Sequence, residues 1–164
     1  MKNILTILGT ITLIGTSTTS LVACNNKPKI HEYTKEQLTK LKAENKINTK
    51  DGILEWISPQ EKPFNTVDDK YYFVVWRGDE NDAWKIIKFQ NNAEQREEQI
   101  LENYKNFRLI LHNQKVLYII EINKRGIPWN IESLNYFKSV YRWNYDTNVP
   151  NLGVNNKTGE LIVN

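Results

Sequence analysis

The stretch that decides the fold is Tyr71-Tyr72-Phe73-Val74-Val75-Trp76, a run of six residues that are all β-branched or aromatic. Such residues favour an extended backbone, and an apolar run without polar alternation is typical of a strand covered on both faces. We therefore place the centre of a β-sheet at residues 71–76. Other elements are expected to pack on both sides of this strand.

Turn sequences on both sides of this strand predict an antiparallel sheet built from hairpins. Gly-Asp-Glu-Asn-Asp at 78–82 leads into a second strand, and His-Asn-Gln-Lys at 112–115 separates two further apolar runs. The segment 155–159 ends in Thr-Gly and predicts a terminal hairpin. The expected strands are, in chain order, 53–57, 71–76, 83–89, 107–111, 116–122 and 161–163.

Three segments have a pattern that favours helices. Thr34 with Gln37 three residues later forms a capping box before a helix at about 35–44, whose apolar face is thin. Apolar residues at helical spacing predict a helix within 91–104 and another at about 130–143. The predicted fold class is α+β, an antiparallel sheet of hairpins with two or three helices on one face.

The order of these elements suggests a pseudo-repeat. A shift of 33 residues superimposes apolar positions of two β-β-α units, and chance agreement between two ordinary hairpin-helix units is the other interpretation. The superimposed positions are Ile86 and Ile119, Ile87 and Ile120, Phe89 and Ile122, Leu101 and Leu134, Tyr104 and Phe137, and Phe107 and Val140.

The first residues have the layout of a secretory signal. Lys2 is followed by an apolar stretch at 4–14 and then by small polar residues up to Leu21-Val22-Ala23-Cys24, which contains the only cysteine of the chain. The apolar stretch is too short to cross a bilayer, although residues 4–23 carry no charge and an uncleaved transmembrane helix is the alternative.

Leu21, Val22, Ala23 and Cys24 resemble the processing motif of bacterial lipoproteins: an aliphatic, an aliphatic or small, and a small residue, then cysteine. The resemblance implies cleavage before Cys24 and a diacylglyceryl group on its sulfur. It covers residues 1–24 alone. The richness in Asn, Ile and Lys, together with the opening residues, resembles lipoprotein leaders of wall-less, spiroplasma-like mollicutes. A lipidated protein of this kind is expected on the outer face of the cell membrane.

The expected domain organisation is a signal peptide at 1–23, a lipidated tether at 24–33 and one α+β domain at 34–164. Residues 24–50 contain seven Lys and three Glu, a net charge of +4, whereas 51–164 contain 14 Lys plus Arg and 16 Asp plus Glu, a net charge of −2. The tether lysines either approach an anionic membrane or are simply solvated. Nucleic acid is an improbable partner for a slightly acidic domain body.

Few residues point to catalysis. His31 and His112 are far apart in the sequence, which disfavours a metal site or a triad, and the scattered glycines form no phosphate loop. The acidic segment 79–82 lacks the glycine and glutamate of a calcium loop and is expected to be a hairpin turn. We predict no catalytic residue, no metal site and no cofactor. Membrane lipid, bound through Cys24, is one expected partner.

Aromatic residues crowd the last predicted helix and give the one binding hypothesis. Tyr136, Trp143 and Tyr145 either form an exposed patch for a protein, peptide or glycan ligand, or pack in the core. The leading hypothesis is a non-enzymatic, membrane-anchored binding module. The alternative is a small surface hydrolase that uses carboxylates, namely Asp68, Asp69, Asp79 or Glu121.

Overall fold

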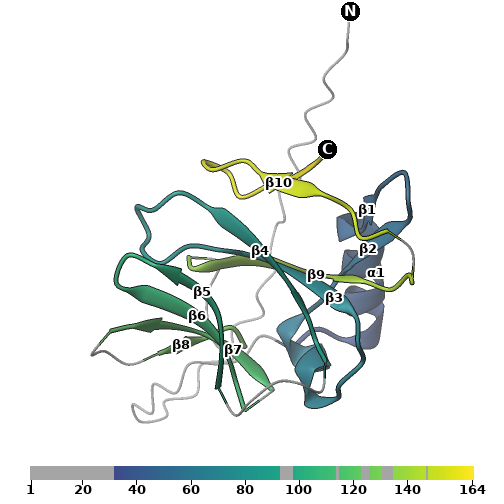
Figure 1. The fold of residues 1–164 in the computed structure, drawn as a ribbon. Helices are drawn as coiled ribbons and strands as arrows, with labels where there is room; N and C mark the ends of the chain where they lie inside the picture. Colours follow the sequence, from purple (N-terminus) through teal and green to yellow (C-terminus); the bar gives the residue numbers. More distant parts are fainter. Residues whose placement is uncertain (1–31, 93–97, 114, 123–125, 131–134, 147) are drawn as a thin grey trace, which may run out of the picture.

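A computed structural model describes residues 32–92, 98–113, 115–122, 126–130, 135–146 and 148–164. The described chain is mostly antiparallel β-sheet with little helix (Figure 1). Its helices are α1 (Lys35–Asn45) and two 3₁₀ turns, η1 (Pro59–Glu61) and η2 (Pro63–Asn65). Its strands are β1 (Ile47–Asn48), β2 (Ile53–Trp56), β3 (Tyr71–Trp76), β4 (Lys85–Gln90), β5 (Glu98–Tyr104), β6 (Phe107–His112), β7 (Val116–Glu121), β8 (Ile127–Pro128), β9 (Phe137–Trp143), β10 (Leu152–Val154) and β11 (Leu161–Val163).

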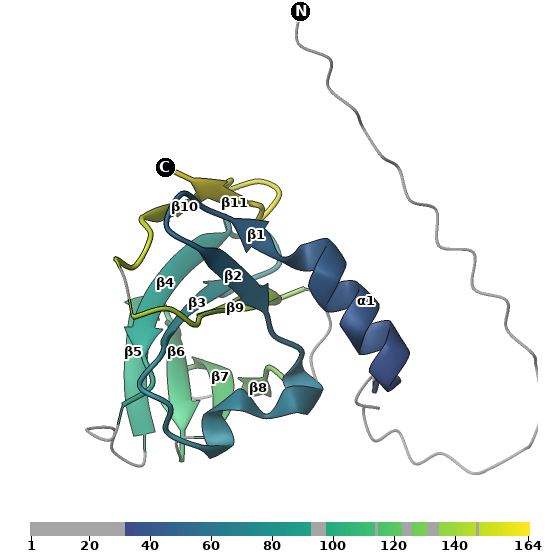
Figure 2. The same ribbon diagram turned by 90° about the vertical axis from the view of Figure 1, so that its right-hand side faces the viewer.

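These strands form three antiparallel groups. Sheet A has the order β1-β2-β9-β3-β4, sheet B has the order β5-β6-β7-β8, and β10 pairs with β11 in a separate hairpin. Figures 1 and 2 show sheet B on one side of sheet A and the β10–β11 hairpin on the opposite side. Sheet A is therefore the middle layer, as expected for an element that contains the apolar run 71–76.

The main core lies between sheets A and B. Alternate residues of a strand share one face, and Tyr72, Val74 and Trp76 of β3 are completely buried on the face toward sheet B. Leu109, Leu111, Leu117 and Ile119 face them from sheet B. Further buried members of this inner core are Ile57, Phe64, Phe89, Trp129, Phe137 and Val140.

The opposite face of sheet A carries a smaller cluster. Leu54, Phe73, Tyr141 and Trp143 are buried there, and side chains of the carboxyl-terminal segment, including Leu161, pack against them. The β10–β11 hairpin therefore covers part of this outer face. Residues 71–76 are covered on both sides, as predicted.

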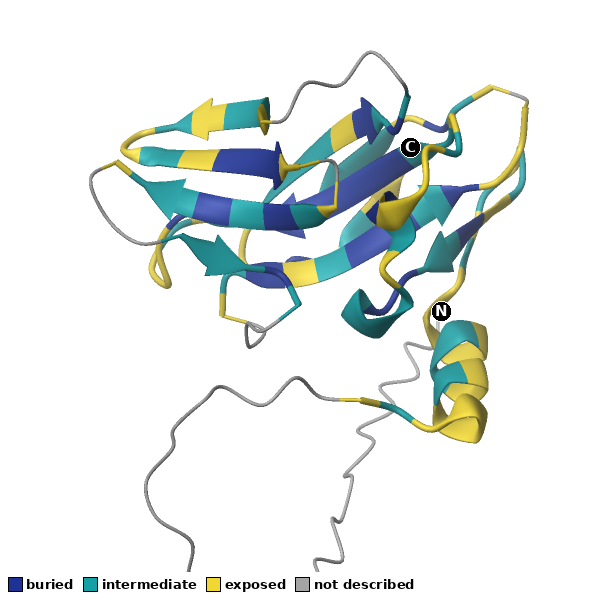
Figure 3. Ribbon diagram, turned by 90° about the horizontal axis from the view of Figure 1, so that it is seen from below, coloured by how far each residue is buried: buried dark blue, intermediate teal, exposed yellow. Residues whose placement is uncertain are grey.

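Helix α1 confirms the predicted capping box. The Gln37 backbone N–H donates to Thr34 Oγ1 over 3.3 Å, and the Thr34 N–H donates to Gln37 Oε1 over 2.9 Å. No residue of α1 is buried, because only a thin stripe with Leu38 and Leu41 turns toward the sheet. Figure 3 shows this difference: the strands contain buried segments, whereas α1 has none.

The hairpins predicted from turn sequences are confirmed. β3 pairs with β4, β6 with β7, and β10 with β11, each antiparallel. The short strand predicted at 53–57 is β2. Turn residues and apolar runs were thus sufficient to find these local pairings.

Two of the three predicted helices are wrong. Within 91–104, the described part after residue 97 is strand β5, and within 130–143, the part after residue 136 is strand β9; residues 93–97 and 131–134 lie outside the described part. The expectation of two or three helices is therefore not confirmed. With strands in place of these helices, the described residues do not form two β-β-α units, which supports chance agreement over a pseudo-repeat. Leu134, one of the superimposed positions, lies outside the described part.

Both strands contain a β-bulge, which contributes to the two errors. In β9 the register against β3 shifts so that Ser139 faces Val75 and Phe137 faces Trp76, which leaves Lys138 as the extra residue. The bulge puts Phe137 and Val140 on the same face at a spacing of three, which is a helical spacing. In β5 a register shift at residue 101 has the same effect.

Candidate functional site

A cluster of charged side chains crosses sheet A beside Tyr72. Glu55 of β2 and Tyr72 of β3 both pair with Arg142 of β9, so the three side chains share one face. Arg142 Nη2 donates to Glu55 Oε2 over 2.8 Å, and Arg142 Nη1 lies 3.7 Å from Asp68 Oδ2. The Tyr72 hydroxyl donates to the same Asp68 oxygen over 2.7 Å.

Helix α1 and the η1 turn are joined to this cluster by one lysine. Lys42 Nζ lies 2.5 Å from both Glu55 Oε1 and Glu61 Oε1. The other Glu61 oxygen, Oε2, accepts from the Ser58 backbone N–H over 2.8 Å. We call Lys42, Glu55, Glu61, Asp68, Tyr72 and Arg142 the polar clamp, because they connect α1, β2, η1 and the start of β3 to β9.

The pKa shifts follow from burial and these partners. Burial raises the pKa of Glu55, but hydrogen bonds from Lys42, Asn144 and Arg142 outweigh it and lower the pKa to about 2. Burial and the bond to Asp68 both raise the pKa of Tyr72. Glu55 is therefore ionised and Tyr72 protonated at neutral pH, and the clamp suits structural pairing more than proton transfer.

The acids proposed for a hydrolase are dispersed. Asp68 belongs to the clamp and also accepts from Asn91 Nδ2 over 2.9 Å. Asp69 precedes β3 and Asp79 follows it, where Asp79 Oδ1 accepts the Asn81 N–H of a turn. Because β3 has six residues, its ends are about 20 Å apart at ~3.3 Å per residue. Glu121 ends β7 in the other sheet.

A groove opens on the outer face of sheet A. Its volume is about 360 Å³, and its floor contains Trp56 and Tyr141. These two residues are direct cross-strand partners on β2 and β9, so their rings are neighbours. Trp56 is half-buried and Tyr141 is 8% exposed, and burial raises the pKa of the Tyr141 hydroxyl. The floor is thus a two-ring aromatic platform.

Two different elements form the walls of this groove. The end of α1 and the start of β1 contribute residues 44–47, and the β10–β11 hairpin contributes 159–161. Lys138, the bulge residue of β9, lines the groove at its rim. Its side chain runs beside Gly159, where a Cβ atom would come within 3.0 Å of Lys138 Cγ. An apolar floor with a polar rim is typical of ligand sites.

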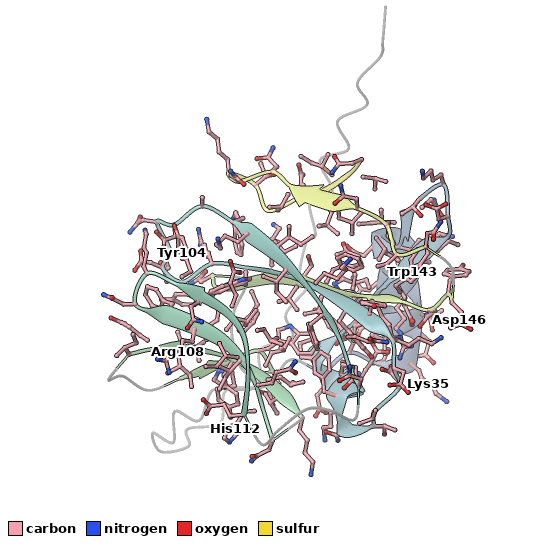
Figure 4. All side chains as sticks on the ribbon, viewed as in Figure 1. Lys35, Tyr104, Arg108, His112, Trp143 and Asp146 are labelled. Carbon is pink, nitrogen blue, oxygen red and sulfur yellow. The ribbon has the colours of Figure 1, made fainter. Side chains whose placement is uncertain are left out.

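The predicted aromatic patch is not one surface. Trp143 is completely buried in the outer cluster, and Tyr136 packs against the inner core on the other side of sheet A. Tyr145 is 41% exposed and packs against Trp143, with the rings tilted by 48° at a centroid distance of 4.8 Å. Figure 4 shows Trp143 at the end of β9 beneath the hairpin, whereas Tyr104, Arg108 and His112 lie on the side of sheet B.

The described residues contain no cluster of His, Cys, Asp and Glu that could hold a metal ion. His112 Nδ1 lies 4.0 Å from Glu98 Oε2, and its ring contacts Tyr118 edge to face. His31 and the predicted lipidation site Cys24 lie outside the described residues. Among the helices of the described residues, none combines the length and apolar character needed to span a bilayer.

Comparisons with protein-family models, with curated proteins and with solved structures returned no match to this chain. Trp56 and Tyr141 were missed as site residues from the sequence. The spacing of Tyr141 suggested a helix, and no local signal reveals that two residues 85 positions apart are cross-strand partners.

Proposed function

We propose that this chain is a lipoprotein anchored through Cys24 on the outer face of the cell membrane, and that its β-rich domain is a non-enzymatic binding module. The motif Leu21-Val22-Ala23-Cys24 supports the anchor. The groove above Trp56 and Tyr141 is the observation that carries the binding function, because it joins an aromatic floor to a polar rim.

The tether enters the fold beside the groove. The Tyr33 N–H donates to Gln60 Oε1 over 2.6 Å, and Gln60 Nε2 donates to the Tyr33 carbonyl over 3.0 Å. This pair fixes the chain just before α1 begins. The Tyr33 ring also meets Trp56 of the groove edge to face, at a centroid distance of 6.5 Å. A lipid at Cys24 would therefore hold the domain by the side on which the groove floor begins.

The anchor is tested with Cys24→Ser in the full chain, expressed in the membrane of a lipoprotein-processing bacterium. Wild type is expected in the detergent phase after phase separation, because two acyl chains give essentially permanent attachment. Cys24→Ser is expected to remain an unlipidated precursor, and Asn26→Ser, which leaves the motif intact, is the matched control. A bare thiol on mature wild-type protein, found by intact mass, would contradict the anchor.

A surface hydrolase is the second candidate, and the dispersed acids give it less support. It requires activity against peptide, glycan or nucleic acid that is lost in the Asp69→Asn or Asp79→Asn variant. We expect none, because these two carboxylates lie at opposite ends of β3.

A further inference from the structure

Strand β11 has an open edge beside the groove. The Asn155 N–H donates to the Glu160 carbonyl over 2.8 Å, which makes these residues a hydrogen-bonded pair of the hairpin. Bonded and non-bonded pairs alternate, so the N–H and C=O groups of Leu161 and Val163 point away from β10. Neither residue makes a backbone hydrogen bond on that side with any described residue.

This edge has one of the usual protections against further pairing, its length of three residues, and lacks the others. Natural edge strands are commonly kept very short or blocked by a charge, a proline or a bulge. β11 is Leu161-Ile162-Val163, without a charge or a proline, and its pairing with β10 is regular. Ile162 is 46% exposed and Val163 is 40% exposed. The strand can therefore accept another strand along its outer side.

The groove adds two cations to this edge. Lys46 and Lys138 both line the groove, both are exposed, and neither has an ion-pair partner among the described residues. Of the two acids of the same groove, Glu44 is paired with Lys40 at 3.8 Å, whereas Glu160 accepts from the Thr158 hydroxyl over 3.1 Å and has no cationic partner among the described residues. Two lysines against one glutamate leave the groove with a net positive charge.

We propose that the groove binds an extended acidic peptide segment, which adds as a strand to the open edge of β11. Main-chain N–H and C=O groups of the peptide pair with Leu161 and Val163. Apolar side chains on one face of the peptide pack on Trp56 and Tyr141, and acidic side chains on the other face reach Lys46 and Lys138. This inference rests on the proposed binding function and names the class of its ligand.

The geometry favours a peptide over a glycan because a strand edge offers alternating donors and acceptors in line, which an extended backbone matches. A glycan would use the aromatic floor and leave the edge unpaired. A second copy of this chain could pair edge to edge, but it would bring its own Lys46 and Lys138 toward like charges.

The first test measures binding of a fluorescent, amidated eight-residue peptide of alternating valine and glutamate to the full-length protein in detergent micelles. Fluorescence anisotropy is expected to show saturable binding, and the lysine-for-glutamate counterpart is expected to bind at least about tenfold more weakly. Lys46→Gln and Lys138→Gln are each expected to weaken binding up to about fivefold, which is the range of exposed charge pairs. Lys50→Gln and Lys157→Gln, at exposed positions outside the groove, are the matched controls.

The second test addresses the strand pairing. Two versions of the peptide are methylated on alternate backbone nitrogens, in registers that differ by one residue. Only one register removes the donors that face β11, so one version is expected to lose about tenfold in affinity and the other to bind nearly as the parent does. Equal behaviour of the two versions would overturn strand addition.

Further results would overturn the inference that the groove binds an acidic peptide. Unchanged affinity in the Lys46→Gln and Lys138→Gln variants, or concentration-dependent self-association that the peptide does not disrupt, would overturn the acidic-peptide inference. A glycan that binds to wild type and not to Trp56→Ala, with no peptide binding, would overturn it too while leaving the proposed binding function intact. If neither class of ligand binds to the groove, both the inference and the proposed binding function fail.

Discussion

The two faces of sheet A carry similar aromatic and aliphatic residues but bury them to different degrees. Toward sheet B, β3 presents Tyr72, Val74 and Trp76, all completely buried under a second sheet. On the outer face, Phe73 and Trp143 are buried, but the neighbouring Trp56 remains half-buried because the β10–β11 hairpin covers only part of the face.

The degree to which each face is covered separates residues that stabilise the fold from residues that can bind a ligand. Aromatic residues alone do not distinguish the two, because both faces have them. The degree of burial distinguishes them. A fully covered face contributes to the free energy of folding. A partly covered face next to unpaired lysines and an open strand edge is available to a ligand.

The largest expected effect comes from truncating a buried side chain on the face of sheet A that sheet B covers. Trp76→Ala removes a completely buried indole and its 2.9 Å hydrogen bond to Glu102 Oε2, and should lower the free energy of unfolding by about 3–5 kcal/mol. Trp56→Ala, on the groove floor, should cost only about 1 kcal/mol because this side chain is already partly solvated. Urea unfolding measures both, and equal losses would contradict the distinction between the faces.

A medium effect is expected from the polar clamp, which closes the covered face at the start of β3. Glu55 has a pKa of about 2 in the folded chain against 4.5 for a free carboxyl, so its contribution is present above pH 4.5 and is lost as the pH falls toward 2. Glu55→Gln should therefore lower the free energy of unfolding by about 1–2 kcal/mol at pH 7, a value reduced for partial exposure.

The difference between wild type and Glu55→Gln should shrink toward zero between pH 4.5 and pH 2. Glu32→Gln, at an exposed position outside the clamp, controls for the loss of a negative charge. A difference that stays constant with pH would show that Glu55 stabilises the fold by packing alone.

The smallest effect on stability is expected from two adjacent residues of β11, one that packs on the outer face of sheet A and one that does not. Leu161 packs against the outer cluster, whereas Ile162 points to solvent. Leu161→Thr should cost about 1 kcal/mol of unfolding free energy, and Ile162→Thr should stay within about 0.5 kcal/mol. Thermal unfolding of both variants measures this, and a larger loss from Ile162→Thr would mean that the hairpin is inverted.

Sequence reasoning succeeded where the signal was local. The run 71–76, the Thr34 capping box and the turns before β4, β7 and β11 each depend on neighbouring residues, and each was found. It failed at β5 and β9, because one extra residue in a strand turns a spacing of two into a spacing of three. A bulge is fixed by the partner strand, so Lys138 could not be recognised as a bulge residue in advance.

The residues of the candidate site could not be predicted from the sequence. The sequence pointed to Tyr136, Trp143 and Tyr145, but assigning the first two to a helix left their actual faces unknown. Trp56 and Tyr141 become a platform only because β2 and β9 are neighbours in sheet A. The polar clamp likewise brings together residues from Lys42 to Arg142, whose long-range pairing no local pattern encodes.

The sequence alone determined the hairpins and the strand at 71–76, because backbone propensity and turn chemistry act over a few consecutive residues. It also carries the motif from which the anchor at Cys24 is proposed. The tertiary structure alone decided which strands became neighbours, which aromatic rings were covered and which strand edge stayed open. Those outcomes depend on packing between segments that are distant in the chain, because the burial and the hydrogen bonding of one segment depend on which other segment lies next to it.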